Sequence, residues 1–267
     1  MKASLAKFVS IYRAHLQEEF EYRLGTVIWI INGMVFPLFV MVLWVGVAQS
    51  VKGFPMTVKQ VVTYFLLSLP VGRLTQAWSW EDLEQRIRNG EFSRFLMLPF
   101  SYVYWDFAHN CAQKTMRILV IVPVFFLVYL ILKDSVDLGL TLSELLFFIL
   151  AILLGLFLRF SYEIFMGTTT FWLIEATAIG AIFGTLSSLF SGSGAPLAAF
   201  PPSIVFIARL LPFRYFLSFP LEVYLGQLND RELLSGFLLG ILWLLFFALL
   251  FKPLFKRGVR VYEGVGI

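Results

Sequence analysis

The sequence predicts an all-α integral membrane protein that forms one transmembrane domain over residues 1–267. Its composition is the first reason, because 59% of the residues are hydrophobic and 14% charged, against about 45–50% and about 25% in soluble domains. Long uncharged stretches are the second, since about 20 apolar residues cross a bilayer. The 30 phenylalanines are the third, because a disordered chain contains few aromatic residues. We count six spans in all.

Residues that are scarce or missing exclude several kinds of site. Cys111 is the one cysteine, which excludes a disulfide within the chain, and only His15 and His109 offer imidazoles. The net charge of +4 is scattered, so we expect no nucleic-acid partner. The chain lacks the G-x-x-x-x-G-K-[ST] pattern of an ATP-binding loop, and residues 1–22 lack the features of a signal peptide. We therefore expect no catalytic, cofactor or metal site on this chain.

The N-terminal segment, residues 1–23, is expected to be an amphipathic helix in the membrane interface. Its apolar residues recur at spacings of three and four, which is the period of one helix face: Leu5, Phe8, Val9, Tyr12, Leu16 and Phe20. The first span follows at 24–51 and contains Pro37. The second, 60–80, carries a single charge, Arg73, which either snorkels outward or faces a central cavity. Arg73 is therefore a candidate for a substrate pathway.

The 78–100 loop contains the most informative pattern, a short charged helix after the second span. Ser79 is placed to cap its N-terminus, with Asp82 in the capping-box position, and Gly90 to end it in a left-handed conformation. Acidic residues precede basic ones at a spacing of four, in the pairs Asp82–Arg86 and Glu84–Arg88. The segment is either a solvated connector or a helix that docks into another protein.

The third span covers 118–132 and begins near Lys114 or earlier, the fourth covers 145–158 and ends at Arg159, and the sixth covers 233–251. We expect Asp106 and Lys114 to stay in water at the start of the third span, and His109 and Cys111 to be packing residues. Arg159 and Glu163, four residues apart, are expected to form an ion pair at the inner surface, near Glu175.

The fifth span is placed at 171–190, because the uncharged stretch that continues to residue 208 is broken by glycines and prolines. Small residues recur at every fourth position and allow close helix packing, within the chain or with another subunit: Ala176, Gly180, Gly184 and Ser188. The outer segment, 192–232, should form short helical pieces that re-enter the outer leaflet. Its charged members, Arg209, Arg214 and Glu222, are either interfacial anchors or parts of a gate.

Six spans place both termini on one side of the membrane. Basic residues favour the side that holds the N-terminus by twelve against six, when those within or beside the spans are left out. The positive-inside rule therefore predicts cytoplasmic N- and C-termini.

Three groups of residues, in this order relative to the spans, resemble the ABC-2-type exporter permeases. They are Glu21-Tyr22-Arg23, the run Ile87-Arg88-Asn89-Gly90-Glu91 that leads to Leu98-Pro99, and the outer run Leu211-Pro212-Phe213-Arg214-Tyr215 with Phe219-Pro220 and Leu225-Gly226. The resemblance covers nearly the whole chain. It implies a six-span subunit of the bacterial inner membrane that exports an amphiphilic or hydrophobic substrate. It also implies two partners, an ABC ATPase that holds the ATP and Mg²⁺ and a second permease, identical or not.

The same resemblance implies roles for residues. The loop helix would be the coupling helix that docks on the ATPase, through Glu81, Asp82, Glu84, Gln85, Arg86, Arg88 and Asn89. The first and fifth spans would face the second permease, the latter through Ala176, Gly180, Gly184 and Ser188. The outer segment would form the gate, with Arg209, Pro212, Arg214, Pro220 and Glu222. Two alternatives remain at this stage, a secondary transporter driven by an ion gradient and a membrane-embedded enzyme that modifies lipids.

Overall fold

The computed structural model describes residues 2–173 and 176–263, and every regular element in these ranges is a helix. The all-helical prediction is therefore confirmed for this part of the chain. In chain order the elements are α1 (Lys2–Glu21), α2 (Arg23–Ser50), α3 (Val58–Thr75), α4 (Ser79–Arg88), α5 (Ser93–Leu96), α6 (Tyr102–Leu132), η1 (Lys133–Ser135), α7 (Leu142–Thr168), η2 (Thr169–Phe171), α8 (Ala176–Phe190), η3 (Leu197–Ala199), α9 (Pro202–Leu210), η4 (Pro212–Phe216), α10 (Ser218–Tyr224) and α11 (Asp230–Val261).

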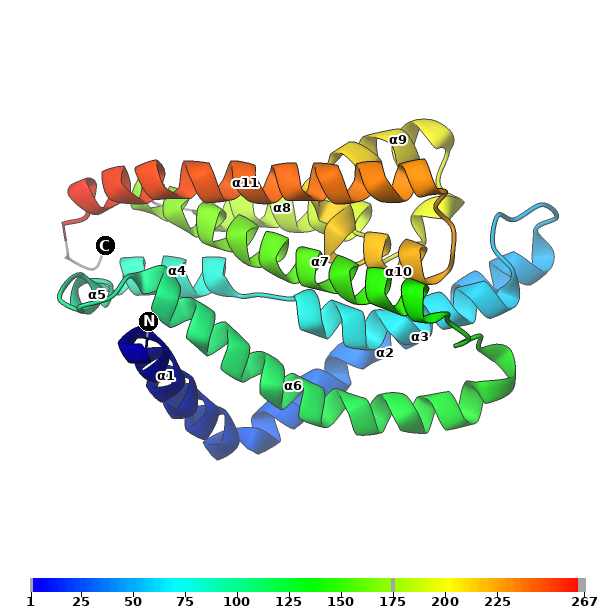
Figure 1. The fold of residues 1–267 in the computed structure, drawn as a ribbon, viewed down its shortest axis with the longest axis horizontal. Helices are drawn as coiled ribbons and strands as arrows, with labels where there is room; N and C mark the ends of the chain where they lie inside the picture. Colours follow the sequence, from blue (N-terminus) through cyan, green and yellow to red (C-terminus); the bar gives the residue numbers. More distant parts are fainter. Residues whose placement is uncertain (1, 174–175, 264–267) are drawn as a thin grey trace.

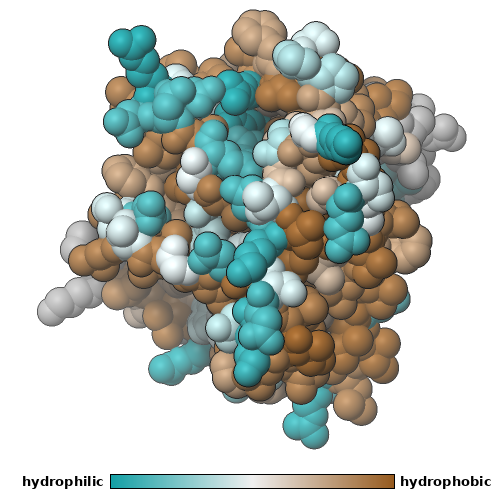
Figure 2. All heavy atoms as spheres, turned by 90° about the vertical axis from the view of Figure 1, so that its right-hand side faces the viewer, coloured by the Kyte–Doolittle hydropathy of each residue, from teal (hydrophilic) through white to brown (hydrophobic). Residues whose placement is uncertain are grey.

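The molecule has two distinct ends. Both ends of the described chain lie beside α4 and α5, whereas α9 and α10 lie toward the opposite end (Figure 1). Seen from that opposite end, hydrophilic residues form a band across the middle and apolar residues surround it (Figure 2). A polar end with apolar flanks is the distribution expected of a protein whose sides face lipid.

Four helical segments are long and apolar enough to cross a membrane: Arg23–Ser50, Tyr102–Ser135, Leu142–Phe171 and Asp230–Val261. The other two predicted spans correspond to α3 and α8. Helix α3 has 18 residues and includes Lys59 and Arg73, and α8 has 15 residues. Four of the six spans thus meet the length and composition expected of a crossing, and crossing by α3 and α8 stays a prediction.

Helix α7 is the central helix, because it packs against α3, α4, α10, α11 and η4. Gly155 makes part of this packing possible, since a Cβ there would collide with the backbone carbonyl of Tyr215 in η4. On the other side of η4, the Tyr215 hydroxyl donates a hydrogen bond to the carbonyl oxygen of Gly236 in α11, at 2.8 Å. Tyr215 therefore joins two long helices through the short outer segment.

Three predicted boundaries, those at the ends of the second, fourth and sixth spans, are wrong, in each case at charged or polar residues. The second span ends at Thr75, since Gln76 has an extended ψ of 135°, and Trp80 belongs to α4. The third begins at Tyr102, in agreement with a start earlier than Lys114. The sixth continues past residue 251 to Val261, and the fourth continues past Arg159 to Thr168. Arg159 does not end its helix because its Nε lies 2.6 Å from Oε1 of Glu163 on the next turn, which confirms the predicted ion pair.

The expectation that Asp106 and Lys114 stay in water is also wrong. Their exposed fractions are 1% and 6%. Lys114 donates hydrogen bonds to Asn110 and, at 2.9 Å, to the backbone carbonyl of Gln76, which lies just past the end of α3. Lys114 is thus satisfied inside the protein, at the helix terminus where a positive charge is most favourable.

An aromatic cluster around Phe92 fastens the end of the molecule that holds the termini. Phe92 is fully buried, and its ring centroid lies between 5.4 and 5.9 Å from those of Phe171, Tyr262, Tyr102 and Phe255. These rings come from η2, α6 and the C-terminal part of α11. Edge-to-face pairs of this kind are favourable in addition to the apolar area that they bury.

Candidate functional site

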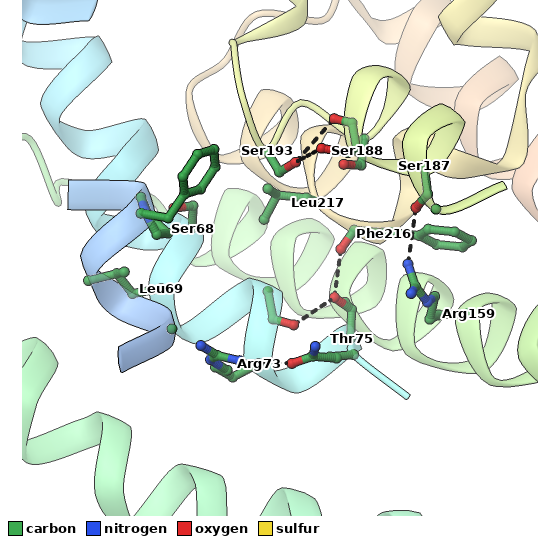
Figure 3. Close-up of a pocket in the computed structure, with 17 residues that line it drawn as sticks. Ser68, Leu69, Arg73, Thr75, Arg159, Ser187, Ser188, Ser193, Phe216 and Leu217 are labelled. Carbon is green, nitrogen blue, oxygen red and sulfur yellow. Dashed lines mark hydrogen bonds between the residues drawn. The ribbon is translucent and has the colours of Figure 1, made fainter. Parts of the chain in front are cut away.

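A polar pocket of about 320 Å³ lies between α2, α3, α7 and α8 (Figure 3). Its polar lining residues are Ser68, Arg73, Thr75, Gln76, Arg159, Ser187, Ser188, Ser191 and Ser193. Phe36 and Pro37 of α2 contribute apolar surface. No carboxylate is among the described residues that line this pocket, and the two charged residues of its lining are both arginines.

Arg73, the predicted pathway candidate, reaches the pocket from α3. Its Nη1 donates a hydrogen bond to Oε1 of Gln76 at 3.0 Å, and its guanidinium lies 4.6 Å from the centroid of the Trp29 ring. Gly33 of α2 leaves room for the guanidinium, because a Cβ at that position would collide with it. Within the described ranges, no acidic side chain forms an ion pair with Arg73.

Arg159 enters the same pocket from α7 and has several partners. Besides its ion pair with Glu163, its Nη1 donates to Oγ of Ser187 in α8 at 3.2 Å, and its guanidinium lies 4.7 Å from the ring centroid of Phe216. Glu163 is 2% exposed, so the pair is largely removed from solvent. Arg159 therefore connects α7, α8 and η4 at one point.

A second cavity of about 320 Å³ adjoins the first. It is lined by carboxylates of α4 and α7, namely Glu81, Glu84 and Glu163. Arg159 and Ser187 line both cavities. The two cavities thus have opposite charge, and Arg159 lies at the boundary between them.

Helix α4 presents two different faces. Ser79, Trp80, Leu83 and Ile87 are buried, and the helix packs against α7 and η2. Of the seven predicted docking residues, three are exposed, Glu81, Gln85 and Asn89. The other four are half-buried, Asp82, Glu84, Arg86 and Arg88. The helix is therefore amphipathic, with one face packed inside the protein and a narrow polar strip left exposed.

The ends and the charge pairs of α4 differ in part from the sequence prediction. Gly90 has a φ of +72°, which confirms the left-handed end, and Glu84 pairs with Arg88 at 3.4 Å as predicted. The capping role of Ser79 is wrong, because Trp78 occupies the N-cap position and makes no side-chain capping bond. Ser79 is instead buried in the first turn, where α4 packs on the rest of the protein.

Asp82 does not form the predicted ion pair with Arg86. It lies 3.6 Å from Nδ1 of His109 in α6, and Arg86 pairs with Glu91 at 3.8 Å. Burial raises the pKa of Asp82 to about 6. A partner on another helix thus competes with the partner on the same helix, and the contact attaches α4 to α6.

His109 also contacts the N-terminal helix, since the ring centroids of His15 and His109 are 4.5 Å apart. Burial lowers the pKa of His15 in α1. Asp82, Asp106 and His109 are the one group of potential metal ligands that the described residues bring together, with ligand atoms within 4.8 Å of one another. Because Asp82 is already paired with His109, this group is explained by the contact between α4 and α6.

The sequence profile of a family described as ABC-2 family transporter protein matches residues 30–266. This chain belongs to the ABC-2 family. The match confirms the resemblance seen in the sequence, and it makes this ABC-2 protein a multi-pass membrane component of an ABC transporter, not an enzyme, with an ABC ATPase as its partner. A search of curated proteins returned no match to the chain.

Helix α1 of this ABC-2 permease packs along α6. The Tyr12 hydroxyl lies 2.9 Å from Oγ1 of Thr115, and the Phe8 ring meets the Tyr104 ring edge-to-face at 5.8 Å. Leu5 and Phe20, from the same predicted apolar face, are exposed. Part of the face is therefore used inside the chain, and its two ends remain available to lipid or a partner.

The small residues of α8 do not all have the same surroundings. A Cβ on Gly180 would lie 3.5 Å from the Trp80 ring, whereas a Cβ on Gly184 would meet nothing within 4 Å. Ser188 lies 3.4 Å from Ser193, Oγ to Oγ, at the rim of the pocket. The side chain of Ala176 lies outside the described residues, as does Glu175. This face of α8 is thus packed against Trp80 at Gly180 and borders open space at Gly184.

The outer segment consists of short helical pieces, as the prolines predicted. Its predicted gate residues lie in different surroundings. Arg214 and Glu222 form a buried ion pair, and Pro212 and Pro220 are buried beside them. Arg209 pairs with Glu232 of α11 at 2.6 Å and is more exposed. The buried pair holds the segment together, and the Arg209 pair attaches it to α11.

Lys114 and Arg117 are residues near the pocket that sequence reasoning did not assign to a site. Both donate to the carbonyl oxygen of Gln76, at 2.9 Å and 3.3 Å. The signal that could have found them is the polar pattern of α6, in which Asn110 and Gln113 precede Lys114 and Arg117 by four residues. Polar residues at that spacing support each other on one helix face.

Proposed function

We propose that this chain is the permease subunit of an ATP-driven exporter. In this proposal the polar residues of α4 dock on the ATPase, the half-buried pair Glu84–Arg88 included, and the pocket between α2, α3, α7 and α8 is one half of the substrate pathway. ATP and Mg²⁺ bind to the ATPase, and this chain contributes the passage through the bacterial cytoplasmic membrane. Both ends of the described chain then lie on the cytoplasmic side, and six helices cross the bilayer.

The position of Arg159 is the observation that carries the proposal. Arg159 lies between the cavity lined by Glu81 and Glu84 of α4 and the pocket lined by Arg73. Because α4 packs on α7, which carries Arg159, a shift of α4 changes the boundary between the two cavities. Closure of two ATPases on ATP can drive such a shift, since a ligand moves an equilibrium by binding one state more tightly.

A second permease completes the pathway. The pocket lies between α2 and α8, the two helices expected to face it, and Gly184 beside the pocket leaves open space. Small residues on such a face let two helices approach closely. The second permease is either a copy of this chain or a similar one.

Purification of the tagged chain in mild detergent from its native host tests this assembly. We expect an ATPase with a P-loop to co-purify, together with a second permease or a second copy of this chain. A chain that purifies alone, and whose transport follows an imposed ion gradient, would instead support the secondary transporter.

A paired substitution on α4 tests the coupling. In the double variant Glu84→Ala, Arg88→Ala we expect the ATPase still to co-purify, while ATP-driven transport by the complex in liposomes falls about tenfold or more. The control is Lys133→Ala, Asp134→Ala, an exposed pair far from α4, which should leave the rate unchanged. Transport at the native rate in the α4 variant would contradict the docking role.

A further inference from the structure

We infer that the pocket of Figure 3 binds the anionic group, a phosphate, sulfate or carboxylate, of an amphiphilic substrate. This inference rests on the proposed function and adds the class of substrate. It starts from the charges of the pocket lining, where Arg73 has no acidic partner among the described residues and Arg159 is paired with Glu163, which lies outside the lining. Guanidinium groups bind phosphate and carboxylate through two parallel hydrogen bonds, which selects for such groups.

Arg73 is the side chain with spare capacity. Its one hydrogen bond goes to the neutral amide of Gln76, and Trp29 covers one face of its guanidinium. Most of its N–H donors therefore have no partner among the described residues. A half-buried charge is unfavourable unless it is paired, so a cation held in this way suits an anionic ligand.

Two further cations strengthen the positive potential. Lys114 and Arg117 both donate hydrogen bonds to the backbone carbonyl oxygen of Gln76, whose side chain accepts the hydrogen bond from Arg73. Of the acids near these cations, Glu163 is already paired with Arg159 at 2.6 Å, and Glu19 lines a separate cavity together with Arg117. Charges in a cavity with low-dielectric walls act more strongly than in water, so the excess favours an anion over a cation.

The hydroxyl groups divide into those that are used and those that are available. Ser68 and Thr75 donate to backbone carbonyls, each at 2.6 Å, and so have no hydrogen left for a ligand. Ser187 accepts from Arg159, which leaves its own hydrogen free, and Ser191 makes no side-chain hydrogen bond within the described residues. Ser187 and Ser191 can therefore donate to an anion that Arg73 and Arg159 bind.

The size and the apolar side of the pocket indicate an amphiphile rather than a free anion. A volume of about 320 Å³ is at the lower limit of small-molecule sites, so it holds a head group and not a long tail. Phe36 of α2 lines the pocket and is 55% exposed, and Val35 and Phe39 beside it are also exposed. A hydrophobic tail would leave the pocket across this apolar surface of α2.

Binding of matched amphiphiles to the full chain in lipid nanodiscs tests the inference. The probes are two fluorescent single-chain amphiphiles with the same tail, one with a phosphate head group and one with a trimethylammonium head group. We expect the phosphate probe to bind at least about tenfold more tightly. Arg73→Gln should remove this preference, and Arg73→Lys should keep part of it. Ser187→Ala should lower the affinity for the phosphate probe and leave the affinity for the trimethylammonium probe unchanged.

The control is Arg231→Gln, which removes an exposed arginine of α11 and should leave binding unchanged. Equal affinity for the two head groups would overturn the inference, because it would show that the head group is not recognised. An equal loss in Arg231→Gln would also overturn it, because it would indicate surface charge only. If inorganic phosphate displaces the phosphate probe and binds as tightly as the probe does, the site binds a free anion. That result would overturn the inference that the ligand is an amphiphile. Should Arg73→Gln not fold, Arg73→Lys and Ser187→Ala decide the outcome.

This result is separable from the proposed function. Selective binding by a chain that has no ATPase partner would keep the anionic site and reject the exporter. A complex with an ATPase whose permease shows no preference between the probes would keep the exporter and reject the anionic substrate.

Discussion

Arg214 and Arg73 are two arginines of one chain whose charges are treated in opposite ways. Arg214 is 3% exposed and forms an ion pair with Glu222, whose second oxygen accepts a hydrogen bond from Ser218 at 3.0 Å. Arg73 has an amide and an aromatic ring as partners but no acid among the described residues. The outer segment thus uses a charged pair to hold its own structure, whereas the pocket contains a cation without an acidic partner, as a site for an anionic ligand requires.

The largest expected effect comes from breaking the buried pair. Glu222→Ala leaves the Arg214 guanidinium buried without an opposite charge, which costs about 3–5 kcal/mol of the free energy of unfolding. Arg73→Gln should change this free energy by less than about 1 kcal/mol, because no pair is broken. Thermal unfolding of both variants in detergent measures the difference.

A further variant sharpens the same comparison. The double substitution Arg214→Met, Glu222→Leu removes both charges and keeps side chains that fill the space, so we expect most of the lost stability to return. Equal midpoints for Glu222→Ala and Arg73→Gln would show that the two arginines are not treated differently.

The next effect contrasts glycines of the core and of the pocket. Gly155→Ala forces a methyl group against the carbonyl of Tyr215 and should destabilise the protein by about 1–3 kcal/mol. Gly184→Ala enters open space and should leave the stability unchanged, or raise it slightly by favouring the helix. Chemical denaturation of the two variants checks this, and a large loss in Gly184→Ala would place that residue in a tight contact.

The smallest effect is a dependence on pH at α4. The pKa of Asp82 rises from 3.8 to about 6 on burial, so the folded state holds this proton more tightly than the unfolded state. Its contribution to stability is therefore present at low pH and is lost as the pH rises from about 4 to about 6. Asp82→Asn should then stabilise the protein above pH 6, by about 1–2 kcal/mol after allowance for partial exposure.

Unfolding midpoints at pH 5 and pH 8 measure this dependence. The native protein should lose stability between these values, and Asp82→Asn should lose less. Asp134→Asn at an exposed position is the matched control. If Asp82→Asn is less stable than the native protein at pH 8, the contact of Asp82 with His109 outweighs the effect of burial.

Features that depend on neighbouring residues could be predicted from the sequence. The first span was expected at 24–51, and α2 covers Arg23–Ser50. The agreement is close because residues 24–51 carry no charge, so the limits of the span are set by the nearest charged residues in the sequence. The left-handed Gly90 and the pairs Glu84–Arg88 and Arg159–Glu163 are also local, since each lies within one or two helical turns.

Features that depend on distant partners could not be predicted. Lys114 was expected in water because a lone lysine is unfavourable when buried, but the carbonyl at the end of α3 lies 38 residues away and satisfies it. Asp82 likewise contacts His109 of another helix instead of the arginine on its own. The pocket itself joins residues of four helices, and only Arg73 was expected to line a pathway. Arg159 was expected only as part of an ion pair, and Gly184 and Ser188 only as packing residues.

Phe92 gives the end of the molecule that holds α4 and α5 a mechanical property. Its ring is fully buried among rings of α6, η2 and α11. The turn after α4 is therefore packed firmly against the C-terminal part of α11. A force applied to this turn does not bend a free loop, because the packed rings leave no slack for it to bend into. It displaces a rigid block, and the long helices attached to that block act as levers that carry the motion along their full length.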